Sequence, residues 1–329
     1  MSAAEVSKVV GHELPDKPVT WLKRDLVLYA LGIGARDPEG DLPFVYELNS
    51  EFRAFPTYPV VLTFKGESQE LNVFADRMKG DKVPGLPPAD PNKIVHGSQS
   101  IEILKPLPLT SGPGWKWKSR YTGISENKTG VVLTIESQLV DPQNVPYAKL
   151  YARMKITGDK FNKAIAGPPQ AKPIPKNKKP DWVYKDQTLS EQALIYRLSG
   201  DYNPLHIGPY KPSPERVERN SSGKPDPAIG QAAGFGGVIL HGLSSFGFAA
   251  RAVVKVIGGN KSDSLKFFGV RFSSPVKPGD ALETQIWEVG PGPNGTIEVT
   301  FVTKNLRTGK DALGSGIAYI VKSSPHAKL

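Results

Sequence analysis

Several stretches of the chain alternate between apolar and polar residues. The runs at 129–140 (TGVVLTIESQLV) and 294–306 (NGTIEVTFVTKNL) follow a two-residue apolar period, which is typical of half-buried β-strands. A further strand closes each half of the chain, at 149–158 and at 312–322. The pattern therefore predicts strands that occur in matched sets.

One segment has helical spacing instead. Between residues 243 and 259, apolar side chains recur every three or four positions, as at Phe246, Ala250 and Val253, and a glycine pair at 258–259 supplies a C-terminal stop. A long helix followed by antiparallel strands predicts an α+β unit with the helix packed on the sheet.

The chain contains one internal repeat. Tyr29 matches Tyr196, Pro106 matches Pro275 and Gly130 matches Gly295, at separations of 167, 169 and 165 positions. Each half opens with a helical stretch, at 24–38 and at 190–204, and continues into the matched strands. Three consistent separations indicate a duplication.

We therefore expect two domains, residues 1–166 and 185–329, because 329 residues also exceed the usual size of one hydrophobic core. Residues 167–184 are rich in proline and lysine, which predicts an exposed, semi-rigid linker. The stretch 211–236 is expected to be an exposed loop of unknown role.

Composition narrows the function. Cysteine is absent, which excludes disulfides, thiolate catalysis and cysteine-based zinc sites. Much of the net charge of +10 lies at 171–180, the signs are mixed elsewhere, and no zinc-finger or RNA-binding signature accompanies it, so we expect no nucleic-acid partner. A basic protein equally favours a polyanionic small ligand. No apolar run approaches the ~20 residues of a membrane span, and the N-terminus lacks the apolar stretch of a secretory signal.

The segment YRLSGDYNPLH at 196–206 carries the densest chemistry. Asp201, Asn203 and His206 fall within six residues, and an Asp before Asn-Pro favours a turn. Such a turn can direct the Asp201 carboxylate and the His206 imidazole toward one point. With ordinary pKa values near ~3.9 and ~6.5, a carboxylate and an imidazole can hold and activate one water molecule. Taken singly, the same residues also suit a helix-capping Asp beside a structural histidine.

A second element is the sequence VILHG at 238–242, which leads into the expected long helix. Backbone N–H groups at a helix start are unpaired and carry positive dipole character, so the Gly242 N–H suits a developing oxyanion. A merely flexible entry to the helix is the alternative.

The segment 196–206 matches Y-x-x-S/T-G-D-x-N-P-L/I/V-H at every defined position. The chain thereby resembles, over nearly its full length, the hydratase 2 (MaoC-like) family, which includes the hydratase domain of peroxisomal multifunctional enzyme type 2. The resemblance implies an α+β fold of two fused hot-dog domains. It also implies (3R)-specific hydration of trans-2-enoyl-CoA in fatty acid β-oxidation.

By the same resemblance, Asp201, Asn203 and His206 are catalytic and the Gly242 N–H binds the thioester oxygen. No metal and no organic cofactor are implied, because coenzyme A arrives as part of the substrate. The resemblance further implies that the N-terminal domain, which lacks the catalytic motif, accommodates the acyl chain, and that the protein forms a homodimer. Val238 stands where the family usually has proline, which puts the local loop path in question.

The resemblance also assigns contacts with the acyl-CoA substrate. They fall on His96, Gly97, Lys128, Tyr202, Pro204, Leu205 and Phe272. Glu47 is a second acid/base candidate of lower rank, because it lies in the half without the Asp/His motif. An exposed lysine in a turn and a strand phenylalanine in the core are the ordinary alternatives for Lys128 and Phe272.

The sequence ends in Ala327-Lys328-Leu329, which resembles the Ser-Lys-Leu peroxisomal address. We therefore expect a peroxisomal protein that binds the import receptor. Two other functions remain open: an acyl-CoA thioesterase, because fold does not fix function, and a non-catalytic acyl-CoA-binding subunit.

Overall fold

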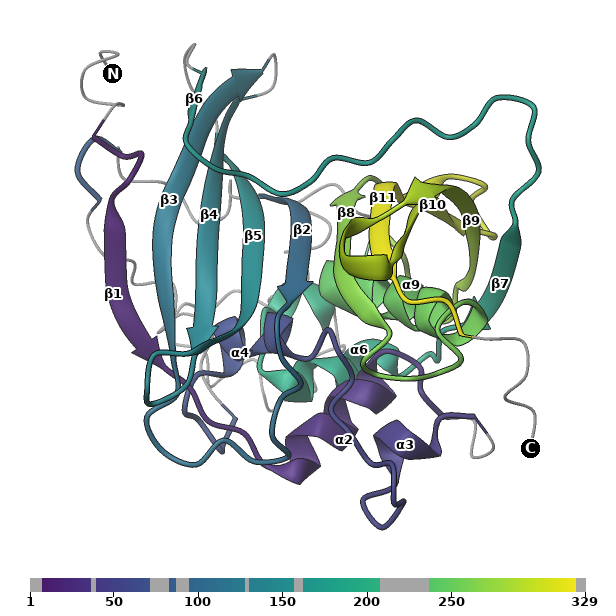
Figure 1. The fold of residues 1–329 in the computed structure, drawn as a ribbon, viewed down its shortest axis with the longest axis horizontal. Helices are drawn as coiled ribbons and strands as arrows, with labels where there is room; N and C mark the ends of the chain where they lie inside the picture. The colour runs from purple at the N-terminus through teal and green to yellow at the C-terminus, as the bar shows by residue number, and fades with distance from the viewer. Residues whose placement is uncertain are drawn as a thin grey trace, which may run out of the picture.

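Eleven strands form one continuous antiparallel sheet in the described part of the chain, which comprises residues 8–36, 40–71, 83–86, 95–127, 130–156, 162–207 and 237–323. In this computed structural model (Figure 1) the strands lie in the order β1-β3-β4-β5-β2-β8-β11-β10-β9-β7, and β6 pairs with β3 beside that path. The sheet thus joins both halves of the sequence.

The elements of the N-terminal half are β1 (Glu13–Pro18), α2 (Lys23–Gly32), α3 (Leu42–Val45), α4 (Pro59–Lys65), β2 (Val95–Ile103), β3 (Lys116–Asn127), β4 (Gly130–Val140), β5 (Pro146–Ile156) and β6 (Asn162–Ala164). Those of the C-terminal half are β7 (Trp182–Gln187), α6 (Gln192–Tyr196), η2 (Arg197–Ser199), η3 (Pro204–His206), α9 (Gly242–Val256), β8 (Leu265–Phe272), β9 (Ala281–Pro291), η4 (Pro293–Gly295), β10 (Ile297–Asn305) and β11 (Asp311–Ile320).

The duplication expected from the sequence is visible in the strand order. Outward from the centre, the first half runs β2, β5, β4, β3, β1 and the second runs β8, β11, β10, β9, β7. The two halves meet where β2 pairs with β8, with Ser100 opposite Gly269. Each strand on this path therefore has a counterpart at the same place in the other half, and only β6, which lies beside the path, has none among the described strands.

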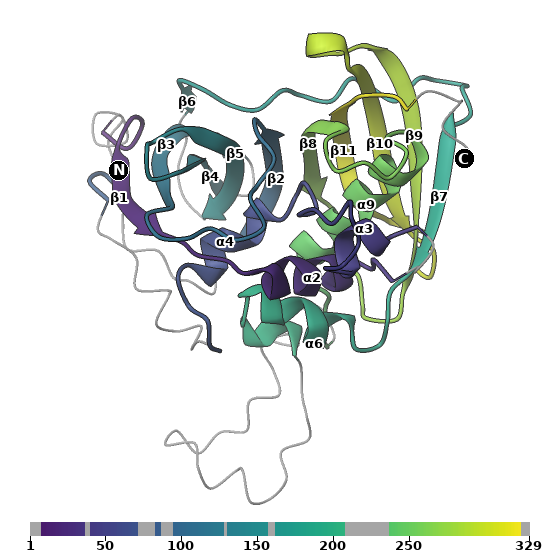
Figure 2. The ribbon, with the colours of Figure 1, turned by 60° about the horizontal axis from the view of Figure 1, so that its bottom comes forward.

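The helices cover the inner face of the sheet. Figure 2 shows α9 in the curve of β8, β11, β10 and β9, and most of its length is buried. This helix begins one residue before the expected 243–259 segment and confirms the α+β prediction. In the N-terminal half α4 is only seven residues long, because Pro59 starts it and Gly66, with φ of +57°, ends it.

The two opening helical stretches of the repeat pack against each other. Helices α2 and α6 lie side by side beneath the sheet (Figures 1 and 2). The rings of Tyr29 and Tyr196, which are matched positions of the repeat, lie 6.1 Å apart. Gly247 of α9 passes so close to Ile33 that a Cβ on it would lie 2.1 Å from the Ile33 side chain.

One large apolar core therefore crosses both halves. It joins Tyr29, Phe55 and Leu150 of the first half to Phe246 and Phe268 of the second, all of them buried. None of the described helices is long and apolar enough to cross a membrane.

The Pro/Lys-rich segment 167–184 runs over the outside of the molecule from β6 to β7 (Figure 1), and its last three residues already belong to β7. It is attached to the C-terminal half: Thr300 Oγ1 donates to the Lys172 carbonyl at 2.9 Å, and Trp287 Nε1 donates to the Lys178 carbonyl at 2.9 Å. The loop predicted at 211–236 lies outside the described residues.

Candidate active site

The turn that carries Asp201 begins at a glycine that no other residue could replace without strain. Gly200 ends η2 with φ of +119°, a region that L side chains rarely adopt. A Cβ on Gly200 would lie 2.7 Å from the backbone N and Cα of Lys65, at the end of α4. We call residues 200–206 the catalytic-type turn. This turn of the second half is thus packed directly on the first half.

Two successive local hydrogen bonds shape the rest of the turn. Asp201 Oδ1 accepts from the Asn203 N–H at 3.2 Å, and Asn203 Oδ1 accepts from the Leu205 N–H at 3.0 Å. Such Asx-type bonds let Asp and Asn replace backbone partners in a turn. The short 3₁₀-helix at Pro204–His206 then returns the chain so that the His206 ring lies beside Asp201.

His206 is held in one tautomer. Its Nδ1 lies 3.0 Å from the Ile239 carbonyl oxygen, which can only accept, so Nδ1 carries the proton and Nε2 presents a lone pair. Burial lowers the pKa of His206, while the nearby Asp201 carboxylate acts in the opposite direction. His206 is therefore a neutral base at pH 7.

His241 completes the cluster, and the sequence reasoning did not select it. Its ring stacks on that of His206, with centroids 3.8 Å apart, and only 1% of the residue is exposed. Nε2 lies 3.0 Å from the Asp201 carbonyl oxygen, so this nitrogen is the donor and Nδ1 keeps the lone pair. Burial above all, and then the neighbouring His206, lowers the pKa of His241 well below its ordinary value.

The carboxylate of Asp201 and ring nitrogens of His206 and His241 all lie within 4.8 Å of one another. One carboxylate and two imidazoles are a common ligand set for a metal ion. However, the two rings are stacked at an interplanar angle of 29°. Nearly parallel rings do not direct their lone pairs to one point about 2 Å from both nitrogens, as a bound zinc ion requires. The geometry favours proton transfer.

Gly242 is the first residue of α9 and follows His241 directly. The first N–H groups of a helix have no partner within the helix, and the helix dipole makes them favourable donors to an anion. A Cβ on Gly242 would lie 3.1 Å from the Phe272 ring. Glycine therefore leaves room between the helix start and Phe272. His241, through its bond to Asp201, ties this donor to the catalytic-type turn.

Two other predicted substrate contacts lie at the same place. The His96 ring packs edge-on against Phe272 with centroids 4.9 Å apart, so the N-terminal half supplies one wall of the site. Gly97 lies at the irregularity between His96 and Ser98 in the pairing of β2 with β5. Burial lowers the pKa of His96 to about 4, and it is neutral at pH 7. Lys128 lies outside the described residues.

The remaining predicted residues lie around this centre or away from it. Tyr202 packs beneath Arg197, whose guanidinium carbon lies 5.7 Å from the ring centroid. Pro204 is exposed and Leu205 is half-buried on η3. Glu47 is exposed in the segment after α3, so its carboxylate does not share the buried environment of the histidines.

Two family models match the chain. Residues 20–150 match the hydratase 2 N-terminal domain of multifunctional enzyme type 2, and residues 225–310 match the MaoC-like domain. A probable enoyl-CoA hydratase 2 of Dictyostelium discoideum is 31% identical over 96% of both chains. The chain belongs to the hydratase 2 (MaoC-like) family. The relatives named as enoyl-CoA hydratase 2 show that this protein is a hydro-lyase.

Two further relatives extend the comparison. The peroxisomal multifunctional enzyme type 2 of Mus musculus is 32% identical over 96% of this chain, which spans 38% of the mouse enzyme. A crystal structure of a MaoC-like dehydratase from Phytophthora capsici covers 97% of this chain and 98% of its own, with 34% identity and a TM-score of 0.80. Rv0216 of Mycobacterium tuberculosis, whose structure is described as a double hot-dog fold, covers 94% of this chain with 12% identity and a TM-score of 0.50, and the expected pair of fused hot-dog units is thereby confirmed.

Proposed function

We propose that the protein catalyses the reversible hydration of trans-2-enoyl-CoA to (3R)-3-hydroxyacyl-CoA. The observation that carries the proposal is the cluster of Asp201, His206 and His241 beside the Gly242 N–H. The cluster combines an acceptor for a water proton with a donor for an enolate oxygen. The Dictyostelium relative, which is named as a probable hydratase of this kind, supports the same reaction.

The proposed reaction begins with the thioester oxygen at the Gly242 N–H and the enoyl C3 facing the Asp201–His206 pair. The Asp201 carboxylate and His206 Nε2 orient a water molecule and remove one of its protons as its oxygen bonds to C3. The electrons of the double bond move onto the thioester oxygen as an enolate, which the Gly242 N–H stabilises. A proton returned to C2 from the same pair completes the addition of one water molecule.

Supporting residues keep this arrangement rigid. Asn203 Oδ1 holds the turn through Leu205, and the Ile239 carbonyl fixes the His206 tautomer that leaves Nε2 free. Phe272 and His96 border the path of the thioester arm beside Gly242. Preorganised groups of this kind act without reorganising during the reaction. Lys128, Tyr202, Pro204 and Leu205 are proposed to contact the CoA part.

The test is an assay of the purified protein with crotonyl-CoA and with trans-2-decenoyl-CoA. Loss of the enoyl absorbance without release of free thiol is the expected result. Release of thiol at the rate of substrate loss would instead establish a thioesterase, in which water attacks the thioester carbon. Binding without turnover of either substrate would leave only a non-catalytic acyl-CoA-binding role.

The N-terminal half is proposed to accommodate the acyl chain. The support is the contrast between the seven-residue α4 and the fifteen-residue α9 over otherwise matched sheets. A shorter helix covers less of its sheet and leaves more of the apolar inner face for a ligand. Comparing kcat/KM for enoyl-CoA substrates of increasing chain length tests this role.

We propose a peroxisomal location and a role in fatty acid β-oxidation. The name of the mouse relative and the tripeptide Ala327-Lys328-Leu329, which lies outside the described residues, support it. We expect the protein to bind the import receptor. We also expect a fluorescent fusion of the protein to lose its peroxisomal targeting when residues 327–329 are removed. The proposed homodimer predicts twice the chain mass of 35.7 kDa in light scattering.

A further inference from the structure

The pairing of β2 with β8 is symmetric under the repeat. Ser98 lies opposite Arg271, and Glu102 lies opposite Phe267. A shift of 169 positions, the separation of Pro106 from Pro275, converts the first pair into the second. The same shift converts the middle pair, Ser100 and Gly269, into itself. A two-fold relation therefore runs through the middle of the sheet, and every site at one end of these strands has a counterpart at the other.

The proposed substrate site lies at one of these two ends. It uses Phe272 at the end of β8 and Gly97 near the start of β2. Under the 169-position shift their counterparts are Ile103, at the end of β2, and Lys266, near the start of β8. The fold thus predicts a second, related site around Ile103 and Lys266.

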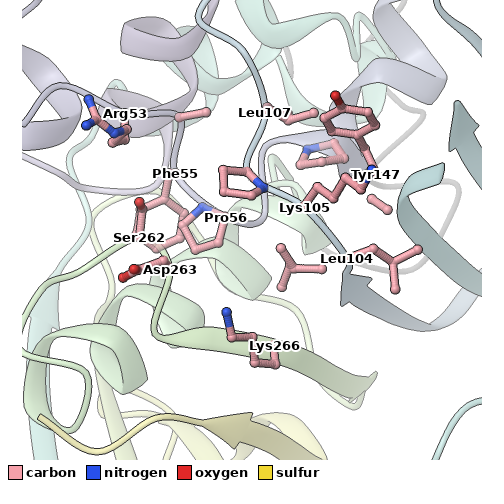
Figure 3. Close-up of a pocket in the computed structure, with 15 residues that line it drawn as sticks. Arg53, Phe55, Pro56, Leu104, Lys105, Leu107, Tyr147, Ser262, Asp263 and Lys266 are labelled. Carbon is pink, nitrogen blue, oxygen red and sulfur yellow. The ribbon is translucent and has the colours of Figure 1, made fainter. Parts of the chain in front are cut away.

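A pocket occupies that position (Figure 3). It is lined by residues of both halves, including Ile103 and Lys266, and it is open to solvent. We name it the mirror pocket, and its lining lies in residues 53–59, 103–107, 147–148 and 262–266.

The mirror pocket also has a helix start, but without a donor. Pro59 begins α4 and lines the pocket, as Gly242 begins α9 beside Phe272. Proline has no N–H, so an oxygen at this helix start finds no hydrogen-bond donor on that residue. The mirror pocket therefore keeps the shape of a binding site but lacks the group that would stabilise an enolate.

The chemistry of the lining suits a ligand with phosphates and an apolar arm. Three cations, Arg53, Lys105 and Lys266, line the pocket and all are exposed, against one carboxylate from Asp263. Lys105 lies 5.4 Å from the centroid of the Tyr147 ring. Guanidinium and ammonium groups are the usual partners of phosphate.

The apolar part of the lining lies between these cations. Figure 3 shows Lys266 pointing toward the space bordered by Pro56 and Leu104. Leu104 remains 37% exposed, so it offers apolar surface to a ligand. Phosphate-binding groups around an apolar floor are what coenzyme A, with its phosphates, adenine and pantetheine arm, requires.

We propose that the mirror pocket is a second, non-catalytic binding site for coenzyme A and its thioesters. The inference rests on the proposed function, because that proposal places a CoA thioester at the Phe272 end of the same strands. Two copies of one binding fold retain two places for one ligand. Only the copy with Asp201, His206 and the Gly242 N–H performs the reaction.

The experiment counts coenzyme A molecules bound per chain by isothermal titration, with free coenzyme A as the probe, in the wild type and in the double variant K105E/K266E. The expected stoichiometry is two for the wild type and one for the variant. The matched control K118E/K310E changes two exposed lysines away from the mirror pocket and is expected to keep both sites. Binding at the second site is also expected to weaken as salt is added.

The other outcomes decide against the mirror pocket, against the proposed function, or against both. A stoichiometry of one in the wild type, or of two in K105E/K266E, would overturn it. Hydration of crotonyl-CoA by K105E/K266E is expected within about twofold of the wild type, and a large loss would show that the pocket serves the catalytic site. Two molecules bound by a wild type that hydrates nothing would refute the proposed function and leave the mirror pocket standing. No binding at all would refute both.

Discussion

Backbone carbonyls set the protonation pattern of the site at the scale of single residues. The Ile239 carbonyl fixes the proton on His206 Nδ1, and the Asp201 carbonyl fixes the proton on His241 Nε2. Each ring is left with one lone pair, and burial keeps each ring neutral at pH 7. His206 and His241 can therefore each accept a proton without first losing one.

The buried histidines predict how stability depends on pH. His96, His206 and His241 all have folded-state pKa values below the ordinary 6.5, with that of His96 at about 4. Between these values and 6.5 the unfolded chain binds more protons, so the free energy of unfolding falls as the pH drops from about 6.5 toward 4. Each such histidine contributes a slope of about 1.4 kcal/mol per pH unit.

Urea denaturation at several pH values measures this slope. For the variant His96→Leu, the free energy of unfolding is expected to change with pH less steeply than in the wild type. The difference in slope is about 1.4 kcal/mol per pH unit, which corresponds to one proton. Equal slopes for the two proteins between pH 6.5 and 4.5 would contradict the assignment of His96 as a neutral imidazole with a lowered pKa.

Sequence reasoning found the residues of the turn but missed His241. Asp201, Asn203 and His206 are close in sequence, so local turn chemistry was enough to bring them together. His241 is forty positions from Asp201, and its partner is a backbone carbonyl, which has no signature in the sequence. The imidazole next to Gly242 in VILHG was the only available signal.

At the scale of helices and turns, the start of α9 and the end of η2 determine the geometry of the site. Gly242 begins α9 and Gly200 ends η2, and both permit an approach that a side chain would obstruct. The first makes room beside Phe272, and the second makes room for the backbone of Lys65. These helix ends thereby set where the donor and the carboxylate lie.

The role of the Gly242 N–H is tested by comparing Gly242→Ala with Gly242→Pro. Both add a Cβ that crowds Phe272, but only proline removes the N–H. Proline is accepted at a first helical position, and His241 already has the extended conformation (φ −54°, ψ 132°) that suits a residue before proline. We expect kcat of the proline variant to be roughly 10² to 10³ lower than that of the alanine variant. Equal kcat values would remove Gly242 from the mechanism.

The contact between the catalytic-type turn and α4 is tested by Gly200→Ala, with Gly279→Ala as the matched control. Gly279 has φ of +90°, and a Cβ added there would have no heavy atom within 4 Å, so alanine adds backbone strain alone. Gly200→Ala adds the same strain and a clash with Lys65. We expect it to lower the free energy of unfolding by about 1 to 3 kcal/mol more than the control, and to lower kcat. Equal destabilisation of the two variants would contradict the close packing.

Periodicity predicted some elements well and others not at all. The strands at β4, β10, β5 and β11 and the helix α9 follow their apolar patterns. The strands β3 and β9 were not predicted, although each pairs along its length with a predicted strand. The short α4 also escaped prediction, because seven residues span too few turns to show a helical period.

Both halves form one folding unit at the scale of the molecule. The sheet is continuous through β2 and β8, and a single core crosses the junction. A buried ion pair adds to it: Arg251 of α9 binds Asp41 of the first half at 2.9 Å, and it also binds Asp186 of β7. Arg251 is 2% exposed and Asp41 is fully buried.

The variant Arg251→Met tests this link. Removing Arg251 leaves the buried Asp41 carboxylate with Lys255, 3.7 Å away, as its remaining ion-pair partner, so we expect a loss below the roughly 3 to 5 kcal/mol of a fully unpaired buried charge. We expect a lower midpoint in urea with one cooperative transition, because the core still joins the halves. The matched control Arg307→Met removes an arginine that is half-exposed beside Asp280, and a smaller effect is expected there. A midpoint unchanged by Arg251→Met would show that the ion pair does not link the halves.

The duplication was the part of the architecture most accessible from sequence, because glycine, proline and tyrosine were kept at matched positions. The pairing of β2 with β8 was not accessible, since it joins strands about 169 positions apart and leaves no local pattern. For the same reason the mirror pocket could not be found before the two strand ends were placed together.

The central claim is that Asp201 and His206 add water to an enoyl thioester held at the Gly242 N–H. The most direct measurement is chiral analysis of the 3-hydroxyacyl product formed from trans-2-decenoyl-CoA by the wild type and by Asp201→Asn. We predict the 3R alcohol from the wild type and a kcat about 10² to 10⁴ lower in the variant. A 3S alcohol, or full turnover by Asp201→Asn, would contradict the account.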